Sequence, residues 1–245
     1  MNAREQMIQE LLGKTVHVEV DRPIGYRHGD IVYPINYGYL PGVVAGDGED
    51  QDVYILGVSK PISSFDGRVI GVIRRRNDQE DKLVVAPEGM YFHQAEIAEA
   101  VHFQEQFFYG KIDSLLQKSC GIIPFRRNGD EKEFLVLLQT NHFWSFPKGH
   151  MEAGETETET ALRELLEETS LTVTLVPDAR TVSEYDMPPL RRKQVVLFLG
   201  EVNGDVTPQE EEIRNYRWVK TNELKDDLHP NTYEACMRLI GEQKE

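Results

Sequence analysis

The sequence has few of the features that mark secreted or membrane proteins. It contains two cysteines, Cys120 and Cys236, which are too few and too far apart for a disulfide framework or a zinc site. No apolar run is long enough to span a bilayer. The opening stretch, MNAREQMIQELLGK, lacks the apolar core of a secretory signal. We therefore expect a cytoplasmic protein.

Positive charge is also scarce. The chain has 27 Lys and Arg against 42 Asp and Glu, which gives a formal net charge of −15. Membrane surfaces and nucleic acids need basic patches, so we expect neither as a general partner. A polyanionic substrate would have to be bound through metal ions and a few local basic residues. The 245 residues are enough for one large domain or two ordinary ones.

The pattern of apolar runs changes along the chain, which predicts two domains. Residues 16–87 hold short β-type runs between Gly, Pro and Asp turns, as in a small β-sheet or barrel. Helical composition from Gln94 to about Gln117 predicts a connector, so we place the boundary near Lys118 and expect domains 1–117 and 118–245. Strands then alternate with helices, which favours an α/β sandwich and an α+β class overall. The strands expected in this second half are 120–126, 133–139, 171–176, 194–202 and 216–219.

The segment GHMEAGETETETALRELLEETSL (149–171) gathers carboxylates onto one short helix. Thr156 and Glu159 have the spacing of a capping box, so the helix should begin near Glu157. Apolar residues at helical spacing predict its buried face, formed by Leu162, Leu165 and Leu166.

Three carboxylates of this helix stand at i, i+3 and i+4, and they are Glu164, Glu167 and Glu168. Like charges at these spacings repel by about 0.2–0.5 kcal/mol per pair. Clustered carboxylate oxygens bind hard divalent cations, and magnesium is often shared between carboxylates and substrate phosphates. The helix is therefore predicted to be a metal platform for phosphate chemistry.

This segment resembles the Nudix box of the Nudix hydrolases. The matching positions are Gly149, Glu155, Arg163, Glu164, Leu165, Glu167, Glu168 and Leu171. Ser170 stands where the family has a glycine that ends the helix in a left-handed conformation, which serine adopts at a modest cost. The resemblance implies an α/β/α Nudix sandwich in the second domain.

The Nudix resemblance also implies a magnesium-dependent phosphoanhydride hydrolase, with manganese as an alternative ion. It makes Glu164, Glu167 and Glu168 magnesium ligands, with the Gly149 carbonyl as a further one. Arg163 would pair with box carboxylates, including Glu155, and hold them in place. The general base varies within the family. Its candidates here are Glu164, Glu168, Glu211 and Glu212.

The lead-in CGIIPF…FWSFPKGH (120–150) is similar to the dinucleoside tetraphosphate hydrolases, as is QEEEIRNYRWV (209–219). This resemblance implies cleavage of diadenosine tetraphosphate to ATP and AMP. It offers Lys148 and Arg126 as phosphate contacts and Tyr185 or Phe143 as adenine-stacking residues. Simpler roles stay open for single residues. Lys148 and His150 could be plain loop residues, Arg126 and Arg127 surface residues, and Trp144 a core aromatic. An RNA cap or a 5′-triphosphate also fits the metal chemistry.

The first half resembles the soluble inorganic pyrophosphatases in a compact form. Four segments match that family in order and spacing, namely YPINYGYLPG (33–42), GDGEDQD (46–52), DKLVVAP (81–87) and HFQEQFF (102–108). The resemblance implies magnesium ligands at Asp47, Glu49, Asp52 and Asp81, with Asp78 as a further candidate. It also implies phosphate contacts from Lys82 and Tyr37.

Several positions depart from the pyrophosphatase pattern. Glu49 replaces an aspartate, Gln51 an apolar residue, and Phe107-Phe108 a Tyr-Lys pair. The hairpin that carries a phosphate-binding arginine is expected to be absent, because only GDIV precedes YPINYGY. Arg27, His28 and Arg74–Arg76 are candidate substitutes for the lost cations. Two interpretations of this domain follow: a second catalytic domain that cleaves pyrophosphate, or a sensor or dimerisation module within a homo-oligomer.

Overall fold

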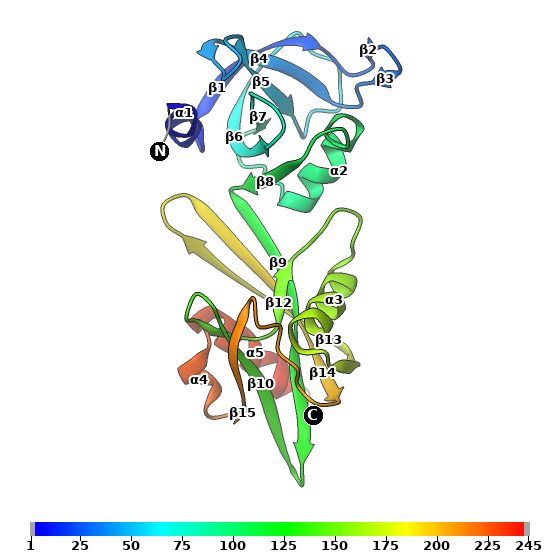
Figure 1. Cartoon of the computed structure of the whole chain (residues 1–245), viewed down its shortest axis with the longest axis vertical. Coiled ribbons are helices and arrows are strands. Elements are labelled where there is room, and N and C mark those ends of the chain that lie inside the picture. The colour runs from blue at the N-terminus through cyan, green and yellow to red at the C-terminus, as the bar shows by residue number, and fades with distance from the viewer. Residues whose placement is uncertain (1–2, 243–245) are drawn as a thin grey trace. The chain divides into compact units, whose positions relative to one another are not determined.

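The computed structural model describes residues 3–242 (Figure 1). The outermost residues of the predicted domains, 1–2 and 243–245, lie outside this range. Contacts divide the chain into two compact units. The first runs to Gln117 and includes Pro188–Arg191, and the second comprises Lys118–Met187 and the chain from Arg192 onward. Within the described part of the chain, no helix is both long and apolar enough to cross a membrane.

The first unit is built on a closed ring of five strands. The ring order is β1-β4-β5-β7-β6, and β1 pairs with β6 as well as with β4, which closes it. The parallel pair is β5–β7, and the other pairs of the ring are antiparallel. This ring confirms the small barrel predicted from the sequence. Its strands are β1 (Thr15–Arg22), β4 (Asn36–Val44), β5 (Asp50–Ile55), β6 (Ser64–Arg75) and β7 (Lys82–Ala86), accompanied by helix α1 (Ala3–Leu11).

The predicted helical connector is wrong in its second half. Helix α2 (Gln94–Glu105) ends well before Gln117, and the chain then forms strand β8 (Gly110–Ser114). β8 pairs antiparallel with β6 at the side of the barrel. The backbone of residues 110–114 thus finds its hydrogen-bond partners in a neighbouring strand, which overrides a local helical composition.

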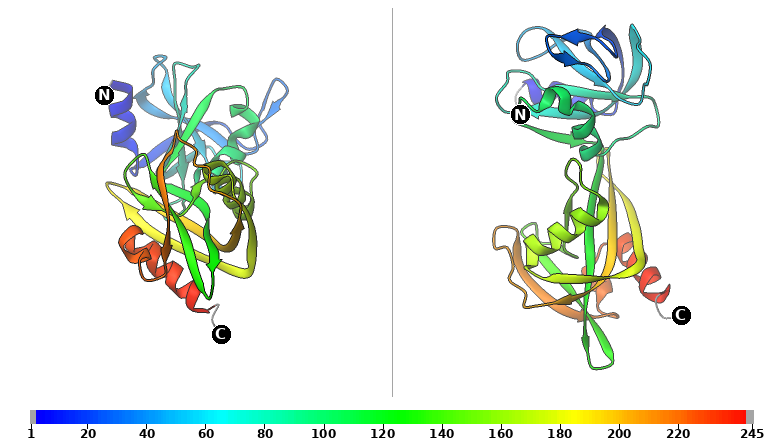
Figure 2. Two further views of the ribbon diagram at one scale, coloured as in Figure 1. Left: turned by 60° about the horizontal axis from the view of Figure 1, so that its bottom comes forward. Right: turned by 90° about the vertical axis from the view of Figure 1, so that its right-hand side faces the viewer.

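The second unit is a seven-stranded sheet with helices on both faces (Figure 2). Its central strands follow the order β11-β10-β9-β14-β13, with β12 paired to β9 and β15 to β10. The strands are β9 (Leu116–Asn128), β10 (Glu131–Gln139), β11 (Trp144–Ser145), β12 (Lys148–His150), β13 (Thr172–Met187), β14 (Arg191–Asn203) and β15 (Ile213–Lys220). The helices are α3 (Glu157–Thr169), α4 (Leu224–Asp227) and α5 (Pro230–Glu242).

Side chains alternate between the two faces of this sheet, as the pleat of a strand requires. On β9, Ile123 and Phe125 belong to the apolar cluster that contains residues of α5. Cys120 and Ile122 belong to a separate cluster with Leu165 of α3. The two clusters confirm the predicted α/β/α sandwich.

Helix α3 begins at Glu157, as predicted. The Thr156 hydroxyl accepts a hydrogen bond from the Glu159 backbone N–H, and the Glu159 carboxylate accepts one from the Thr156 backbone N–H. The predicted buried face is correct only at Leu165, because Leu162 and Leu166 are 38% and 55% exposed. Instead, the buried stripe runs at i, i+4, i+7 and i+8 and consists of Ala161, Leu165, Glu168 and Thr169. A carboxylate therefore stands on the side of the helix that faces the sheet.

Ser170 ends α3 in the left-handed conformation that the sequence predicts there, with φ 60° and ψ 13°. Its backbone N–H donates to the Leu166 carbonyl at 2.8 Å, which closes the last turn. This conformation is sterically unfavourable for serine because of its Cβ atom, and it is not unfavourable for glycine, which has none.

We predict that Ser170→Gly raises the free energy of unfolding of the second unit by about 0.5–1 kcal/mol, because glycine removes the strain at the helix end. Urea denaturation followed by tryptophan fluorescence measures it, since both tryptophans, Trp144 and Trp218, lie in this unit. Leu166→Gly, at an exposed helical position, should lower the same free energy by about 1 kcal/mol. A loss of stability in Ser170→Gly would contradict the prediction.

Candidate functional site

The carboxylates of α3 line a cleft of about 730 Å³ in the second unit. Strand β12, which contains Gly149, and the segment before β15 form other parts of its wall. Its lining residues are Ser119, Gln139, Thr140, Asn141, Lys148, Gly149, His150, Glu152, Arg163, Glu164, Glu167, Glu168, Tyr185, Lys193, Gln209 and Glu212. The structure thus brings together the three predicted metal carboxylates, Arg163, Gly149 and four other residues singled out in the sequence: Lys148, His150, Tyr185 and Glu212.

Arg163 connects the acidic residues around this cleft. Its guanidinium donates to both carboxylate oxygens of Glu155, at 2.6 and 2.9 Å. It also donates to Glu164 at 2.7 Å and to Glu167 at 3.2 Å. A fifth hydrogen bond, to the His150 carbonyl at 3.1 Å, ties the helix to β12. These contacts hold the pKa of Glu155 down to about 2, so this carboxylate is a permanent anion.

Gly149 allows β12 to pass directly under α3. A Cβ atom at this position would lie 2.0 Å from the carboxylate carbon of Glu164, closer than any real contact. β12 pairs antiparallel with β9 through Gly149 and Cys120. The glycine therefore leaves room for the Glu164 carboxylate beside the backbone of this strand.

Glu168 is the buried acid of the site, with 2% of its surface exposed. Burial raises its pKa to about 8, and repulsion from Glu164 and Glu212 adds to this effect, while Lys148 opposes it. Its carboxylate accepts a hydrogen bond from the Lys148 backbone N–H at 3.1 Å. Burial also raises the pKa of Glu164. The cleft therefore stabilises the neutral forms of two acids until further positive charge enters it.

Lys193 of β14 is a residue of this cleft that the sequence analysis missed. Its ammonium group is buried and donates to the Ser119 hydroxyl at 2.7 Å, and it lies 3.2 Å from the His150 ring. Burial, with repulsion from Lys148, lowers the pKa of Lys193 to about 8. The available signal was its place in RRKQVVLF, where a lysine occupies an inward position of an apolar strand.

Other expected residues take different places. Tyr185 lines the cleft and stacks on the ring of His229, with centroids 4.1 Å apart. Phe143 is 73% exposed and is not among the lining residues, nor is Glu211. Trp144 packs against the core, as its simpler interpretation predicted.

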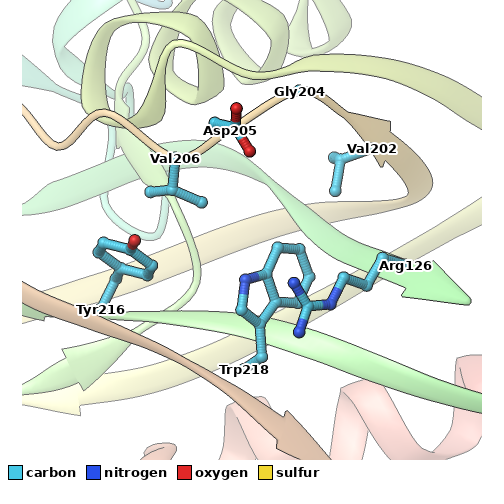
Figure 3. A pocket seen from close by; sticks show the side chains of 7 residues that line it. All are labelled: Arg126, Val202, Gly204, Asp205, Val206, Tyr216 and Trp218. Atoms are coloured by element: carbon cyan, nitrogen blue, oxygen red, sulfur yellow. The ribbon is translucent and has the colours of Figure 1, made fainter. Parts of the chain in front are cut away.

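Arg126, expected as a phosphate contact, is not brought to the carboxylate cleft. It lies at a second hollow, with its guanidinium over the ring of Trp218 at 4.1 Å (Figure 3). Glu133 accepts hydrogen bonds from this guanidinium at 2.8 and 2.6 Å. The pairing of β9 with β10 sets Arg126 directly opposite Glu133, which explains this placement.

The donor set of the cleft fits a hard divalent cation. Glu164, Glu167 and Glu168 line the same cleft as Gly149. Because Gly149 has no side chain, the Glu164 carboxylate can lie beside the backbone of β12. Within residues 3–242, no three His, Cys, Asp or Glu side chains converge tightly enough to form a closed cation cage. Here the carboxylates of Glu164 and Glu167 are already engaged, because one nitrogen of the Arg163 guanidinium donates to both. Cation binding would thus replace part of this guanidinium pairing.

The first unit has an acidic hollow of its own, of about 490 Å³. It is lined by Asp21, Arg22, Tyr39, Asp47, Glu49, Asp50, Asp52 and Glu80. At its base, the carboxylate of Asp52 accepts hydrogen bonds from Tyr37 and from Lys82. The structure therefore brings together five of the expected residues, which are Asp47, Glu49, Asp52, Tyr37 and Lys82. Asp21 and Arg22 are additions that the sequence analysis did not identify.

Asp81 does not reach this hollow. It is buried, and its carboxylate is bound by the Arg4 guanidinium and by the Arg75 backbone N–H. Its neighbour Glu80 points into the hollow instead and pairs with Lys82. Adjacent residues of an extended segment point in opposite directions, so a shift of one residue exchanges a metal position for a structural one. Asp78 is likewise engaged elsewhere, by Arg75 at 2.7 Å.

Two of the five cations offered as substitutes for lost phosphate contacts, Arg74 and Arg75, are paired with acids. Arg75 binds Glu105 through two nitrogens, at 3.0 and 2.5 Å, and Arg74 binds Glu5 at 2.6 and 3.1 Å. The segment before YPINYGY forms a two-stranded hairpin of β2 (Arg27–His28) and β3 (Ile31–Val32). It leaves Arg27 exposed and away from the lining of the hollow.

Comparisons with known proteins match both parts of the chain. The model of the NUDIX domain matches residues 115–239, and that of inorganic pyrophosphatase matches residues 3–141. The two matches overlap over 115–141, where the structure forms β9 and β10 of the second unit's sheet.

Curated relatives show the same division. The asymmetrical bis(5′-nucleosyl)-tetraphosphatase of Mus musculus is 35% identical over 120 residues, which cover 43% of this chain and 80% of that protein. Its Caenorhabditis elegans counterpart is 30% identical over 132 residues, which cover 51% of this chain and 93% of that protein. The inorganic pyrophosphatase of Saccharolobus solfataricus is 36% identical over 72 residues, which cover 28% of this chain and 40% of that protein.

We predict that Glu168→Gln stabilises the metal-free protein more at pH 9 than at pH 5. The unfolded chain has already lost most of the Glu168 proton at pH 5, because its ordinary pKa is 4.5, whereas the folded chain keeps this proton up to about pH 8. Wild-type stability therefore falls as pH rises through this window, and glutamine removes the loss. Calorimetry in EDTA should show a midpoint higher by about 5 °C at pH 9. Glu234→Gln, on the exposed face of α5, is the control. An equal shift at both pH values would refute the assignment.

Proposed function

This chain belongs to the Nudix family through its second unit and to the inorganic pyrophosphatase family through its first. We propose that the second unit hydrolyses a dinucleoside tetraphosphate. Phosphoanhydride hydrolysis is the common chemistry of the Nudix class. The observation that carries the proposal is the cleft that places three carboxylates of α3 opposite two lysines, Lys148 and Lys193.

The acidic side of this cleft is proposed to hold the metal. Magnesium, or manganese in its place, would be bound by Glu164, Glu167 and Glu168 with the carbonyl of Gly149, and divalent ions are general for this family. Bound divalent ions neutralise charge on phosphate oxygens and activate water. Arg163 keeps the carboxylates in position through the contacts described above. Because Glu167 is the most exposed of the three, its carboxylate is free to turn toward an incoming ion.

The basic side is proposed to bind the polyphosphate. Lys148 and Lys193 both line the cleft, and an anionic substrate would restore their full charge, which burial disfavours. Glu212 faces Glu164 and Glu168 from the segment before β15 and is the proposed general base, with Glu164 and Glu168 as alternatives.

The nucleoside end of the substrate is assigned to Tyr185. Its ring is held flat against His229 at an interplanar angle of 21°, which preorganises a surface for a base. The relatives in mouse and nematode are named for asymmetrical cleavage of bis(5′-nucleosyl) tetraphosphates. We therefore propose diadenosine tetraphosphate as the substrate, with ATP and AMP as products.

The first unit supports a second activity, the hydrolysis of inorganic pyrophosphate. The observation that favours it is the contact of Asp52 with both Tyr37 and Lys82 at the base of an acidic hollow. Lys82 pairs with both Asp52 and Glu80, so a phosphate bound in the hollow would contact Lys82 beside the proposed metal-binding carboxylates. Asp47 and Asp52 are the proposed metal positions that the structure retains in this hollow. The alternative for this unit is a sensor or dimerisation module without turnover.

We predict that Glu167→Gln lowers kcat for diadenosine tetraphosphate by about a hundredfold or more, since one metal carboxylate is lost while the fold, at this exposed position, is kept. Chromatography of the products measures both rate and cleavage pattern. Glu234→Gln should retain the wild-type rate. Full activity in Glu167→Gln would remove this residue from the metal site, and two ADP molecules as products would reject asymmetric cleavage.

For the first unit, Asp52→Asn should lower phosphate release from pyrophosphate by about a hundredfold, because asparagine cannot pair with Lys82 or bind a metal with full charge. The rate of dinucleotide cleavage should not change. Asp66→Asn, an exposed acid on β6 that pairs with His17, is the matched control. If the wild-type protein releases no phosphate from pyrophosphate, the sensor or dimerisation alternative replaces this proposal.

A further inference from the structure

The second hollow of the second unit is separate from the carboxylate cleft and has a different character. It encloses about 240 Å³, several times the roughly 30 Å³ that one water occupies in the liquid. Its walls combine two aromatic rings, two valines, one arginine and one acid (Figure 3). The lining residues are Arg126, Val202, Gly204, Asp205, Val206, Tyr216 and Trp218.

Trp218 lines this hollow and is in contact with the residues around it. It is partly buried against the apolar cluster that contains Leu165 of α3. The guanidinium of Arg126 covers one side of its ring, and Glu133 fixes that guanidinium through two hydrogen bonds. An aromatic platform of this kind binds flat rings at a low cost in conformational entropy.

Three polar groups at this hollow lack partners. The Trp218 indole N–H, the Tyr216 hydroxyl and the Asp205 carboxylate make no hydrogen bond or ion pair with any residue of the described range 3–242. Asp205 and Tyr216 are exposed and Trp218 is half-buried, so these groups are accessible to a ligand from solvent. A flat ligand that carries both N–H donors and acceptors on its edges would satisfy all three.

The hollow and the cleft share one stretch of chain. Gly204, Asp205 and Val206 line the hollow, while Gln209 and Glu212 of the same connection line the cleft. Both also lie on the α3 side of the sheet, since Trp218 packs in the cluster under α3. A substrate with two nucleosides needs a second place for a base, and residues 204–212 contribute to the walls of both the hollow and the cleft.

We propose that this hollow is a second nucleobase subsite, and that Asp205 makes it prefer guanine. This proposal rests on the proposed function for its role in catalysis, but not for the binding itself. Guanine presents two adjacent N–H donors that a carboxylate can accept together, whereas adenine places an acceptor beside its single amino group. The stacking surface is Trp218 with Arg126, and Tyr216 closes the side.

Nuclear magnetic resonance of the full-length protein tests the binding directly. The chain has two tryptophans and hence two indole N–H signals, which Trp144→Phe assigns, or Trp218→Phe should the first variant fail to fold. GMP should shift the Trp218 signal with a dissociation constant about tenfold lower than that of AMP. Ribose 5-phosphate, which lacks a base, should leave that signal in place. These titrations need neither metal nor turnover, so their result is independent of the catalytic assignment.

Asp205→Asn should abolish the preference for GMP while the shift of the Trp218 signal by either nucleotide persists. Glu201→Gln, an acid of β14 paired with Arg127, should change neither. In the hydrolysis assay, Asp205→Asn should raise KM about tenfold for a guanine-containing dinucleoside tetraphosphate with kcat kept. A Trp218 signal unmoved by millimolar GMP, or moved equally by ribose 5-phosphate, would overturn the proposal. Unchanged preference in Asp205→Asn would overturn the role of the carboxylate.

Discussion

The second unit depends on one cation, the Arg163 guanidinium, which binds three carboxylates and one backbone carbonyl. Without it, Glu164 and Glu167 would repel each other on one side of a short helix, and Glu155, just before the helix, would add a third unpaired negative charge. With it, the helix is fixed to β12 through His150, and Glu155 is held as a permanent anion. A single side chain thus converts a repulsive cluster into an ordered set of oxygen ligands.

Arg163 does not contact Glu168, so the charge of this carboxylate is not neutralised by the guanidinium. Glu168 lies on the buried stripe of α3, where desolvation favours its neutral form, and the half-buried Lys148 and the buried Lys193 line the same cleft. Metal ions and a polyphosphate would supply the missing charges of both signs together. The site is therefore electrostatically complementary to a metal–polyphosphate complex more than to either component alone.

The first unit uses a related principle on an unrelated fold. Lys82 is held between Asp52 and Glu80 at the base of an acidic hollow, while Asp81 is turned inward and bound by Arg4. Two acids that are adjacent in sequence thus have opposite roles. One faces the hollow, and the other stabilises the barrel. The division of the cations is similar, because Arg74 and Arg75 pair with acids of the helices and are not available to a phosphate.

Local sequence was sufficient for features whose causes are local. The capping box at Thr156, the start of α3 and the left-handed Ser170 all follow from interactions within a few residues, and the barrel and sandwich follow from repeated patterns of apolar residues. Features that depend on distant partners were decided only by tertiary structure. Packing of α3 against the sheet buries Glu168 and leaves Leu162 and Leu166 exposed. β-pairing turned residues 110–114 into a strand, and alternation along the chain put Glu80 in the place expected of Asp81. Lys193 lines the cleft because β14 contributes to its wall. Arg126 does not line the cleft, because the pairing of β9 with β10 places Arg126 beside Glu133. Burial and pairing are properties of contacts between segments far apart in the chain, and the spacing of residues within one segment does not contain them.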